Sequence, residues 1–281
     1  MAEKASRRVK TLNSFIKWAA QFNDGQYLFR GVSNESYEIE ASAYRRLPEG
    51  ARNNPAWLLR INQDLIEKAR LLGHDQKDGQ QLSDLELLAE LQHFGAATCL
   101  IDFTRNALVA LWFACQQSSK GKANGKVFAV RIDDSDRFEV ITPKLVKKEN
   151  IDYFFREDER KGYPLYQWQP KYQNNRIIAQ QSVFIFGGAQ VEIEAECVVL
   201  RSGKQDMLTS LDKVSGITEG SIYPDFDGFA RLHAHNKPYV EADPQVRLQR
   251  GIEVHQRGDL EDAIDDYDEV ISSPNPEGDL E

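Results

Sequence analysis

Hydrophobic residues recur at helical spacing at several places in the chain. Apolar side chains three or four positions apart line one face of a helix. The first such stretch begins at Leu12 and is stopped by Asn23-Asp24-Gly25, and another ends at Gly73. Ser83 and Glu86 have the spacing of a capping box, which marks the start of a third helix. The pattern predicts helices over residues 12–22, 57–72, 83–93, 106–114 and 205–214.

Runs of β-branched and aromatic residues, bounded by glycine and polar turns, predict strands. These strands run through Phe29 and over residues 125–132, 137–141, 177–186 and 196–201, and residues 98–101 form a short extended piece. Helices dominate the early part of the chain and strands the later part, so the sequence predicts an α+β fold. We expect a mixed or antiparallel sheet core with flanking helices.

The pattern changes near Pro244, where we place a domain boundary between residues 1–243 and a helix pair in residues 244–281. Several residues of this second segment fall at spacings that resemble one tetratricopeptide repeat, namely Gly251, Gly258, Ala263, Tyr267 and Pro274. One repeat cannot bury its own apolar face. It therefore packs on the main domain, pairs with another chain, or begins a longer helical array, and we favour the array.

Composition and charge narrow the class of partner. The 281 residues are 41% hydrophobic, which is enough for a sizeable core, and they carry a formal net charge of −9. An acidic protein is repelled by nucleic acids and anionic membranes, so we expect neither as a partner, apart from what one local basic groove could bind. No stretch approaches the ~18 apolar residues that span a bilayer, and the charged first residues lead us to expect a cytoplasmic protein.

The three cysteines give no sign of a disulfide framework or a metal site. Cys99, Cys115 and Cys197 are odd in number, widely spaced and flanked by apolar residues. Such cysteines are typical of small buried side chains. We expect no structural or catalytic metal.

The densest group of candidate site residues lies between Leu91 and Phe113. Six polar side chains surround a short apolar core there, which is more than packing requires: Gln92, His93, Asp102, Thr104, Arg105 and Asn106. Further upstream, a strand-like apolar run ends in Arg30 and Gly31. The glycine permits a close approach to the backbone.

Each of these residues also has a purely structural interpretation. Arg30 could form an interior ion pair with one of the 44 carboxylates. Asp102 and Arg105 could bridge each other or cap the next helix, and Thr104 could be a cap as well. His93 could owe its place to the dipole at a helix C-terminus.

Several motifs, taken in order, resemble the FRG domain, a family associated with bacteria and phages. The resemblance covers about residues 10–235, and by itself it implies no particular activity. Ala96-Ala97 depart from the family pattern. The motifs are Phe29-Arg30-Gly31, Gln92-His93-Phe94-Gly95, Asp102-Phe103-Thr104, Ala110-Leu111-Trp112-Phe113-Ala114, Arg176-Ile177 with Gln180 and Phe184, and Gly216-Ile217-Thr218-Glu219 with Tyr223-Pro224-Asp225.

A second resemblance, to ADP-ribosyltransferases, suggests an activity and a sheet of the type found in those enzymes. They place an Arg on one strand and a Ser or Thr on the next, similar to Arg30 and Thr104 here. The resemblance implies that NAD is the substrate. Arg30 then clamps a phosphate or ribose, Gly31 admits the ring and Thr104 buttresses the pocket.

The resemblance also implies a Glu or Gln on a later strand. Gln180 or Gln181 is the first choice for this position and Glu219 the alternative, although an amide cannot act as a general base. Cleavage of the nicotinamide–ribose bond passes through a positively charged sugar, which such residues would orient and stabilise. The implied cofactor-binding set is Arg30, Gly31, Gln92, His93 and Arg105.

Two hypotheses for the whole chain follow. In the first, the protein is an NAD-binding ADP-ribosyltransferase-like or NAD-cleaving toxin or antiviral effector, whose C-terminal repeat recruits a protein target. In the second, it is a non-catalytic module that binds a nucleotide or a protein and is coupled to helical repeats. The first requires Arg30, His93, Thr104 and a Gln or Glu to meet in one cleft.

Overall fold

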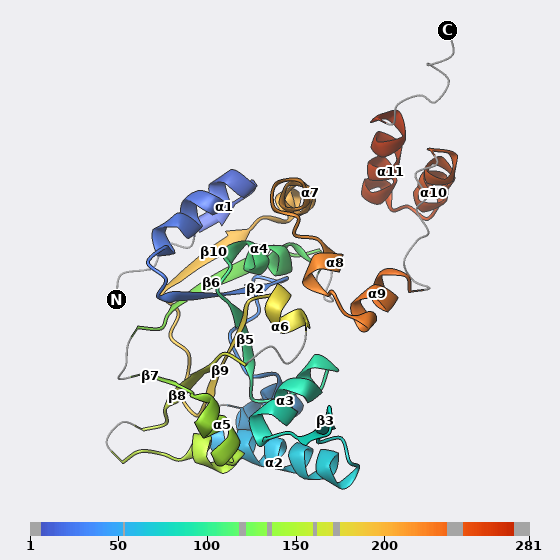
Figure 1. Cartoon of the computed structure of the whole chain (residues 1–281). Helices are drawn as coiled ribbons and strands as arrows, with labels where there is room; N and C mark the ends of the chain where they lie inside the picture. The colour runs from blue at the N-terminus through green and yellow to red at the C-terminus, as the bar shows by residue number, and fades with distance from the viewer. Residues whose placement is uncertain are drawn as a thin grey trace. The chain divides into compact units, whose positions relative to one another are not determined.

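The structure is a computed structural model that describes residues 7–52, 54–117, 122–133, 137–159, 162–170, 175–234 and 244–272. The chain divides into two compact units, which meet in sequence at Asp225 and Phe226. The first unit holds the sheet and the second is helical (Figure 1).

An eight-stranded mixed sheet forms the centre of the first unit, as far as the described residues go (Figure 1). Its strand order is β1-β10-β6-β2-β5-β9-β8-β7. Neighbours are antiparallel except at the two edges, where β1 pairs with β10 and β7 with β8 in parallel. The strands are β1 Arg7–Val9, β2 Tyr27–Val32, β5 Ile101–Thr104, β6 Gly125–Arg131, β7 Phe138–Val140, β8 Leu165–Trp168, β9 Ser182–Gly187 and β10 Ala195–Val199.

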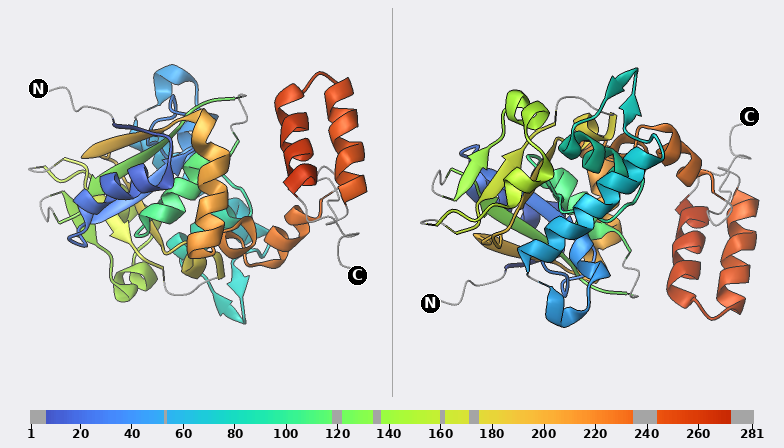
Figure 2. Two further views of the ribbon diagram at one scale, coloured as in Figure 1. Left: turned by 90° about the horizontal axis from the view of Figure 1, so that it is seen from above. Right: turned by 90° about the horizontal axis from the view of Figure 1, so that it is seen from below.

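Helices cover both faces of this sheet. In Figure 2, α1 and α7 face the viewer from above, and α2 and α3 from below. A small hairpin, β3 Gln76–Lys77 with β4 Gln80–Gln81, stands apart from the main sheet. The helices of this unit are α1 Leu12–Ala19, α2 Pro55–Leu71, α3 Asp84–His93, α4 Ala107–Cys115, α5 Pro143–Lys148, α6 Asn175–Ala179, α7 Lys204–Ser215 and α8 Glu219–Ile222.

Two hydrophobic clusters follow from the alternation of side chains along the strands. Leu28 and Phe29 are adjacent on β2, so their side chains point to opposite faces. Phe29 belongs to a cluster with buried residues of α1, α4 and α7. Leu28 belongs to the other cluster, with buried residues of α2, α3, β5, β8 and β9. Each layer of helices therefore has its own core.

The sheet is weakly joined at its middle. β2 pairs with β6 at all six of its residues, and β5 pairs with β9 at all four of its own. Between β2 and β5, the described structure has a single registered pair, Phe29 with Thr104. The two strands diverge beyond that pair, and the residues that follow Phe29 and precede Thr104 are free to line a cavity.

Two glycines let α4 lie directly on the sheet. A Cβ atom at Gly31 would stand 1.8 Å from the carbonyl oxygen of Ala110, and one at Gly125 would stand 2.0 Å from that of Ala114. The close approach expected at Gly31 is confirmed. The group that approaches the position of the missing Cβ is the backbone of α4. The expectation that Gly31 admits a ligand ring stays a prediction.

Most of the predicted helices are confirmed, together with their caps. Asn106 accepts the Leu108 N–H at 3.0 Å at the start of α4. Ser83 and Glu86 form the expected capping box at the start of α3. The α+β class and the mixed sheet are confirmed, but the expectation of helices early and strands late is wrong, because β2 and β5 lie at the centre of the sheet.

The strand predicted over residues 177–186 is shorter than expected. Residues 175–179 form α6, and β9 begins only at Ser182. The N–H groups of Gln180 and Gln181 close this helical turn on the carbonyls of Arg176 and Ile178. Ile177 and Ile178 extend the apolar run of β9, and periodicity alone does not separate a short buried helix from a strand.

The second unit contains α9 Phe226–Leu232, α10 Pro244–Gln256 and α11 Leu260–Ser272. The helices α10 and α11 pack side by side (Figure 1). Gly258, at φ +88°, makes the tight turn between them. Pro274 and residues 235–243 lie outside the described residues, so the likeness to a tetratricopeptide repeat and the boundary at residue 243 stay predictions. No helix in the described part of the chain has the length and apolar character needed to cross a membrane.

The contact between Gly31 and α4 predicts a large effect of one methyl group. Gly31→Ala should lower the free energy of unfolding by about 3 kcal/mol or more, because the backbone of α4 would have to move. Denaturant unfolding measures this. Gly50→Ala is the matched control, since nothing lies within 4 Å of its added Cβ; it should change stability by less than about 0.5 kcal/mol. Equal stability of both variants would contradict the packing described.

Candidate functional site

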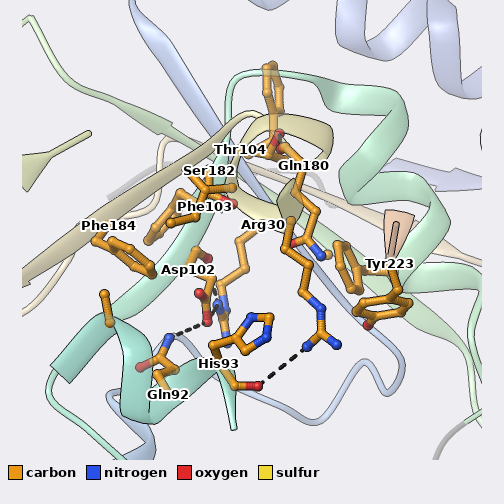
Figure 3. Close-up of a pocket in the computed structure, with 16 residues that line it drawn as sticks. Arg30, Gln92, His93, Asp102, Phe103, Thr104, Gln180, Ser182, Phe184 and Tyr223 are labelled. Atoms are coloured by element: carbon orange, nitrogen blue, oxygen red, sulfur yellow. Dashed lines mark hydrogen bonds and ion pairs between the residues drawn. The ribbon is translucent and has the colours of Figure 1, made fainter. Parts of the chain in front are cut away.

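A cavity of about 270 Å³ lies where β2 and β5 diverge. Its wall combines charged, amide and aromatic side chains from β2, α3, β5, α4, α6 and β9, together with Tyr223 (Figure 3). The polar residues that line it are Arg30, Gln92, His93, Asp102, Thr104, Arg176, Gln180 and Ser182. The aromatic ones are Phe29, Phe103, Phe113, Phe184 and Tyr223.

Arg30 crosses the gap between the two strands. Its Nη1 donates to the backbone carbonyl of Asp102 at 2.5 Å and lies 3.9 Å from the Asp102 Oδ2 atom. Its Nε is buried and has no hydrogen-bond partner among the described residues. Burial lowers the pKa of the guanidinium, which the Asp102 charge opposes and Arg45 reinforces. An arginine remains charged at neutral pH all the same, so Arg30 brings a fixed positive charge with a spare donor.

Asp102 presents a carboxylate to the cavity. Its side chain is 55% exposed, yet protein surrounds it closely enough for loss of solvation to raise its pKa. Arg30 and Gln92 pull that pKa down and do not cancel the effect of burial. Figure 3 shows the three side chains converging. The pair of Arg30 and Asp102 lies at the cavity. The purely structural interpretation of Arg30 predicted an ion pair in the interior of the protein.

Gln92 is held in one orientation. The Thr98 hydroxyl accepts the N–H of Leu100 at 3.1 Å and donates its proton to Gln92 Oε1. Because an ionised carboxylate can only accept, the Gln92 amide nitrogen must face Asp102 and the amide oxygen must face Thr98. The Nε2 group therefore faces Asp102, to which it donates at 2.8 Å. The carboxylate is thus fixed from a second side.

Thr104 and Gln180 connect β5 with the turn before β9. The Thr104 hydroxyl donates to the Gln180 carbonyl at 2.7 Å and accepts the Asn106 N–H at 3.0 Å. The Gln180 Nε2 group donates to the Ile222 carbonyl at 3.1 Å. The Thr104 hydroxyl has used its proton and one of its lone pairs, so Thr104 shapes the wall of the cavity.

Arg176 also lines the cavity. In the sequence, only the FRG motifs pointed to this residue. It stands on α6, and its guanidinium lies 4.9 Å from the ring centroid of Tyr223. Nη2 donates to Asp225 Oδ1 at 2.9 Å, and Nε lies 2.5 Å from Oδ2. Nη1 donates to the His93 carbonyl at 3.4 Å. The motifs Arg176-Ile177 and Tyr223-Pro224-Asp225 therefore meet in space.

The cavity gathers six of the nine predicted site residues, namely Arg30, Gly31, Gln92, His93, Thr104 and Gln180. The other three are not among the described residues that line it. Gln181 is in the turn before β9, at φ +48°, and its carbonyl accepts the N–H of the exposed Arg105. Glu219 begins α8. Asp102 contacts Arg30 and Gln92. The purely structural interpretation had suggested a salt bridge between Asp102 and Arg105.

Residues 25–123 match the family model of the FRG domain. This segment runs from the turn before β2 to just before β6, and it supports the resemblance to the FRG family that the sequence motifs carry. Arg30, Gln92, His93, Asp102 and Thr104 fall inside it. Searches of curated proteins and of solved structures found no match.

Metal-binding side chains do not gather in the described part of the chain. No group of three or more His, Cys, Asp or Glu side chains there is arranged to hold an ion. Cys99, Cys115 and Cys197 are buried and unpaired in disulfides, as expected. Burial raises the pKa of each thiol, for example to about 12 for Cys115.

The raised pKa of Asp102 predicts a pH-dependent stability difference. The contribution of Asp102 to the stability of wild type should be lost as pH rises from the unfolded-state pKa of about 4 through the raised folded-state pKa, because the folded state binds the proton of this carboxyl more tightly. Asp102→Asn lacks this slope, so its stability relative to wild type should rise with pH in that window. Denaturant unfolding at a series of pH values measures the difference.

Asp133→Asn is a control of opposite sign. The hydrogen bond from Arg131 lowers the pKa of Asp133, so the contribution of this carboxylate is lost as pH falls. The stability of Asp133→Asn relative to wild type should therefore fall as pH rises. The same sign for both variants would contradict the environment described for Asp102.

Proposed function

We propose that the cavity between β2 and β5 binds NAD and that the first unit is an ADP-ribosyltransferase-like or NAD-cleaving enzyme. Its role would be that of a toxin or an antiviral effector. The resemblance of Arg30, Gly31 and Thr104 to the motifs of ADP-ribosyltransferases motivates the proposal. The observation that carries it is the convergence of Arg30, His93, Thr104 and Gln180 on one cavity, together with Asp102.

The charges of the cavity suit the chemistry. Loss of nicotinamide leaves positive charge on the ribose, which a nearby carboxylate stabilises. Asp102 is the carboxylate that reaches this cavity, and Arg30 and Gln92 hold it in place. In this proposal, Asp102 takes the position that the sequence comparison gave to Gln180, Gln181 or Glu219. Arg30, with its spare Nε donor, binds the ribose or the adjoining phosphate.

The size of the cavity suits one half of a dinucleotide. Pockets for small molecules hold roughly 300–1,000 Å³, and this one is just below that range at about 270 Å³. Phe113 and Tyr223 form an aromatic wall, with ring centroids 6.3 Å apart. A planar nicotinamide ring can pack against such a wall. The nicotinamide riboside half would occupy the cavity and the adenosine half would lie outside it.

The helical second unit would bind a protein target or a regulator in this proposal. Leu248, Ile252, Leu260, Ile264 and Ile271 are exposed on α10 and α11, and a helix pair with an apolar surface is typical of repeats that stack on a neighbour.

One observation favours the alternative, a non-catalytic nucleotide- or protein-binding module. The charges at the cavity already satisfy one another, since Arg30 is paired with Asp102 and Arg176 with Asp225. A recognition site needs no free base, whereas proton transfer to an attacking group does. Among the possible acceptors of an ADP-ribosyl group, water and acceptors that are already reactive have the least need of a general base.

Calorimetry with NAD and an assay of nicotinamide release with cell extract test the enzyme proposal. Arg30→Lys keeps the charge and removes the planar fork with its Nε donor, so NAD binding should weaken at least about tenfold. Asp102→Asn should slow release about 10²-fold, with binding changed by less than about threefold, because the carboxylate acts mainly on the transition state.

Arg131→Lys, at the surface end of β6, is the matched control and should match wild type. Binding of NAD without release in wild type would reject the enzyme and favour the recognition module. Nicotinamide release at the wild-type rate by both Arg30→Lys and Asp102→Asn would reject this cavity as the site.

A further inference from the structure

Arg176 lines the cavity and is paired with Asp225, and neither residue has a part in the proposed chemistry. Both side chains are mostly buried, with exposed fractions of 12% and 17%. Two atoms of the guanidinium face the two oxygens of the carboxylate, at 2.9 Å and 2.5 Å. His93 approaches the same carboxylate, with Nε2 3.9 Å from Oδ2. The Asp225 carboxylate is thus an internal anion beside the cavity.

The edge of Arg176 that meets Asp225 is also the edge that binds phosphate. A guanidinium recognises carboxylates and phosphates by the same pair of parallel donors. Arg176 itself lines the cavity, and stacking on Tyr223 together with the bond to the His93 carbonyl fixes its plane. A phosphate that enters beside Arg176 would meet a preformed donor pair already occupied by Asp225.

We propose that Arg176 is a second anion-binding residue of the cavity and that Asp225 is its internal competitor. The pyrophosphate of a dinucleotide displaces the carboxylate and pairs with the guanidinium in its place. This inference rests on the proposed function in one respect, the choice of a nucleotide diphosphate as the ligand. The affinity observed for that ligand is reduced by the fraction of molecules in which Asp225 occupies Arg176.

The position of Asp225 in the sequence gives the exchange a consequence. Asp225 is the last residue of the first unit, and α9 begins at Phe226. A ligand that releases Asp225 therefore releases the residue from which the helical unit continues. By reciprocity, a partner that pulls Asp225 away from Arg176 would tighten ligand binding.

A purely positional role for Asp225 makes the opposite prediction. If the carboxylate served only to orient Arg176, its removal would weaken ligand binding, as removal of Arg176 would. If it competes, its removal strengthens binding. Asp225→Asn keeps the shape of the side chain and removes the charge, so the direction of the change in affinity separates the two roles.

The test is calorimetric titration of the full chain with ADP-ribose and, separately, with inorganic pyrophosphate. Asp225→Asn and Asp225→Ser should bind both about three- to tenfold more tightly than wild type, which is the range expected when a partly buried ion pair no longer competes. Arg176→Gln should bind at least about tenfold more weakly. Arg176→Lys keeps the ion pair and loses the fork, and it should fall between Arg176→Gln and wild type.

Asp227→Asn is the matched control, since this carboxylate is exposed and lies two residues away. It should change affinity by less than about twofold. Thermal unfolding of every variant shows whether it is folded, and the Ser and Lys variants provide a second measurement at each position.

Weaker binding by both Asp225 variants, or unchanged binding by the Arg176 variants, would overturn the inference. Nicotinamide release, measured on the same preparations, separates it from the proposed function. The expected affinity shifts without any release would retain the anion site and reject the enzyme. Nicotinamide release that is lost in the Arg30 variant but unchanged in the Arg176 and Asp225 variants would retain the enzyme and reject the anion site. No binding of either probe by wild type or Asp225→Asn would reject both.

Discussion

The rest of the structure depends on the single residue pair that joins β2 to β5. An antiparallel sheet normally satisfies its carbonyls with main-chain N–H groups. Beyond Phe29 and Thr104 the strands separate, and the carbonyl of Asp102 is satisfied by the guanidinium of Arg30. A side chain thus replaces a main-chain donor, and this replacement keeps a charged group at the centre of a sheet and opens a cavity beside it.

Close packing on one face keeps that opening in place. Helix α4 lies on Gly31 and Gly125 so closely that its carbonyls fill the space of their missing Cβ atoms. The position of β2 is therefore fixed by β6 and α4 together, while β5 follows β9. Phe113 of α4 also lines the cavity. The same helix that fixes the strand thereby supplies part of the wall.

Two arginine–aspartate pairs set the electrostatics of the cavity. In our two proposals, Arg30 and Asp102 carry the chemistry, and Arg176 and Asp225 control access to a second anion site. The pairs differ in exposure, since the Asp102 side chain is 55% exposed and that of Asp225 only 17%. An exposed carboxylate is available to a substrate, while a mostly buried one that is paired with an arginine has to be displaced first. One cavity can hold both functions because the two pairs come from different elements.

The sequence by itself determined most of the longer helices of the first unit, two of their caps and the α+β class, because spacing, capping boxes and β-branched runs act over a few residues. Ser83 with Glu86, and Asn106, are of this kind. It also pointed to Arg30, Gln92, His93 and Thr104 through motifs. Only the tertiary structure decided that Asp102 turns to Arg30, that Gly31 makes room for a helix, and that Arg176 meets Asp225. Those contacts join residues 72, 79 and 49 positions apart, and no local pattern encodes which distant partner a side chain meets.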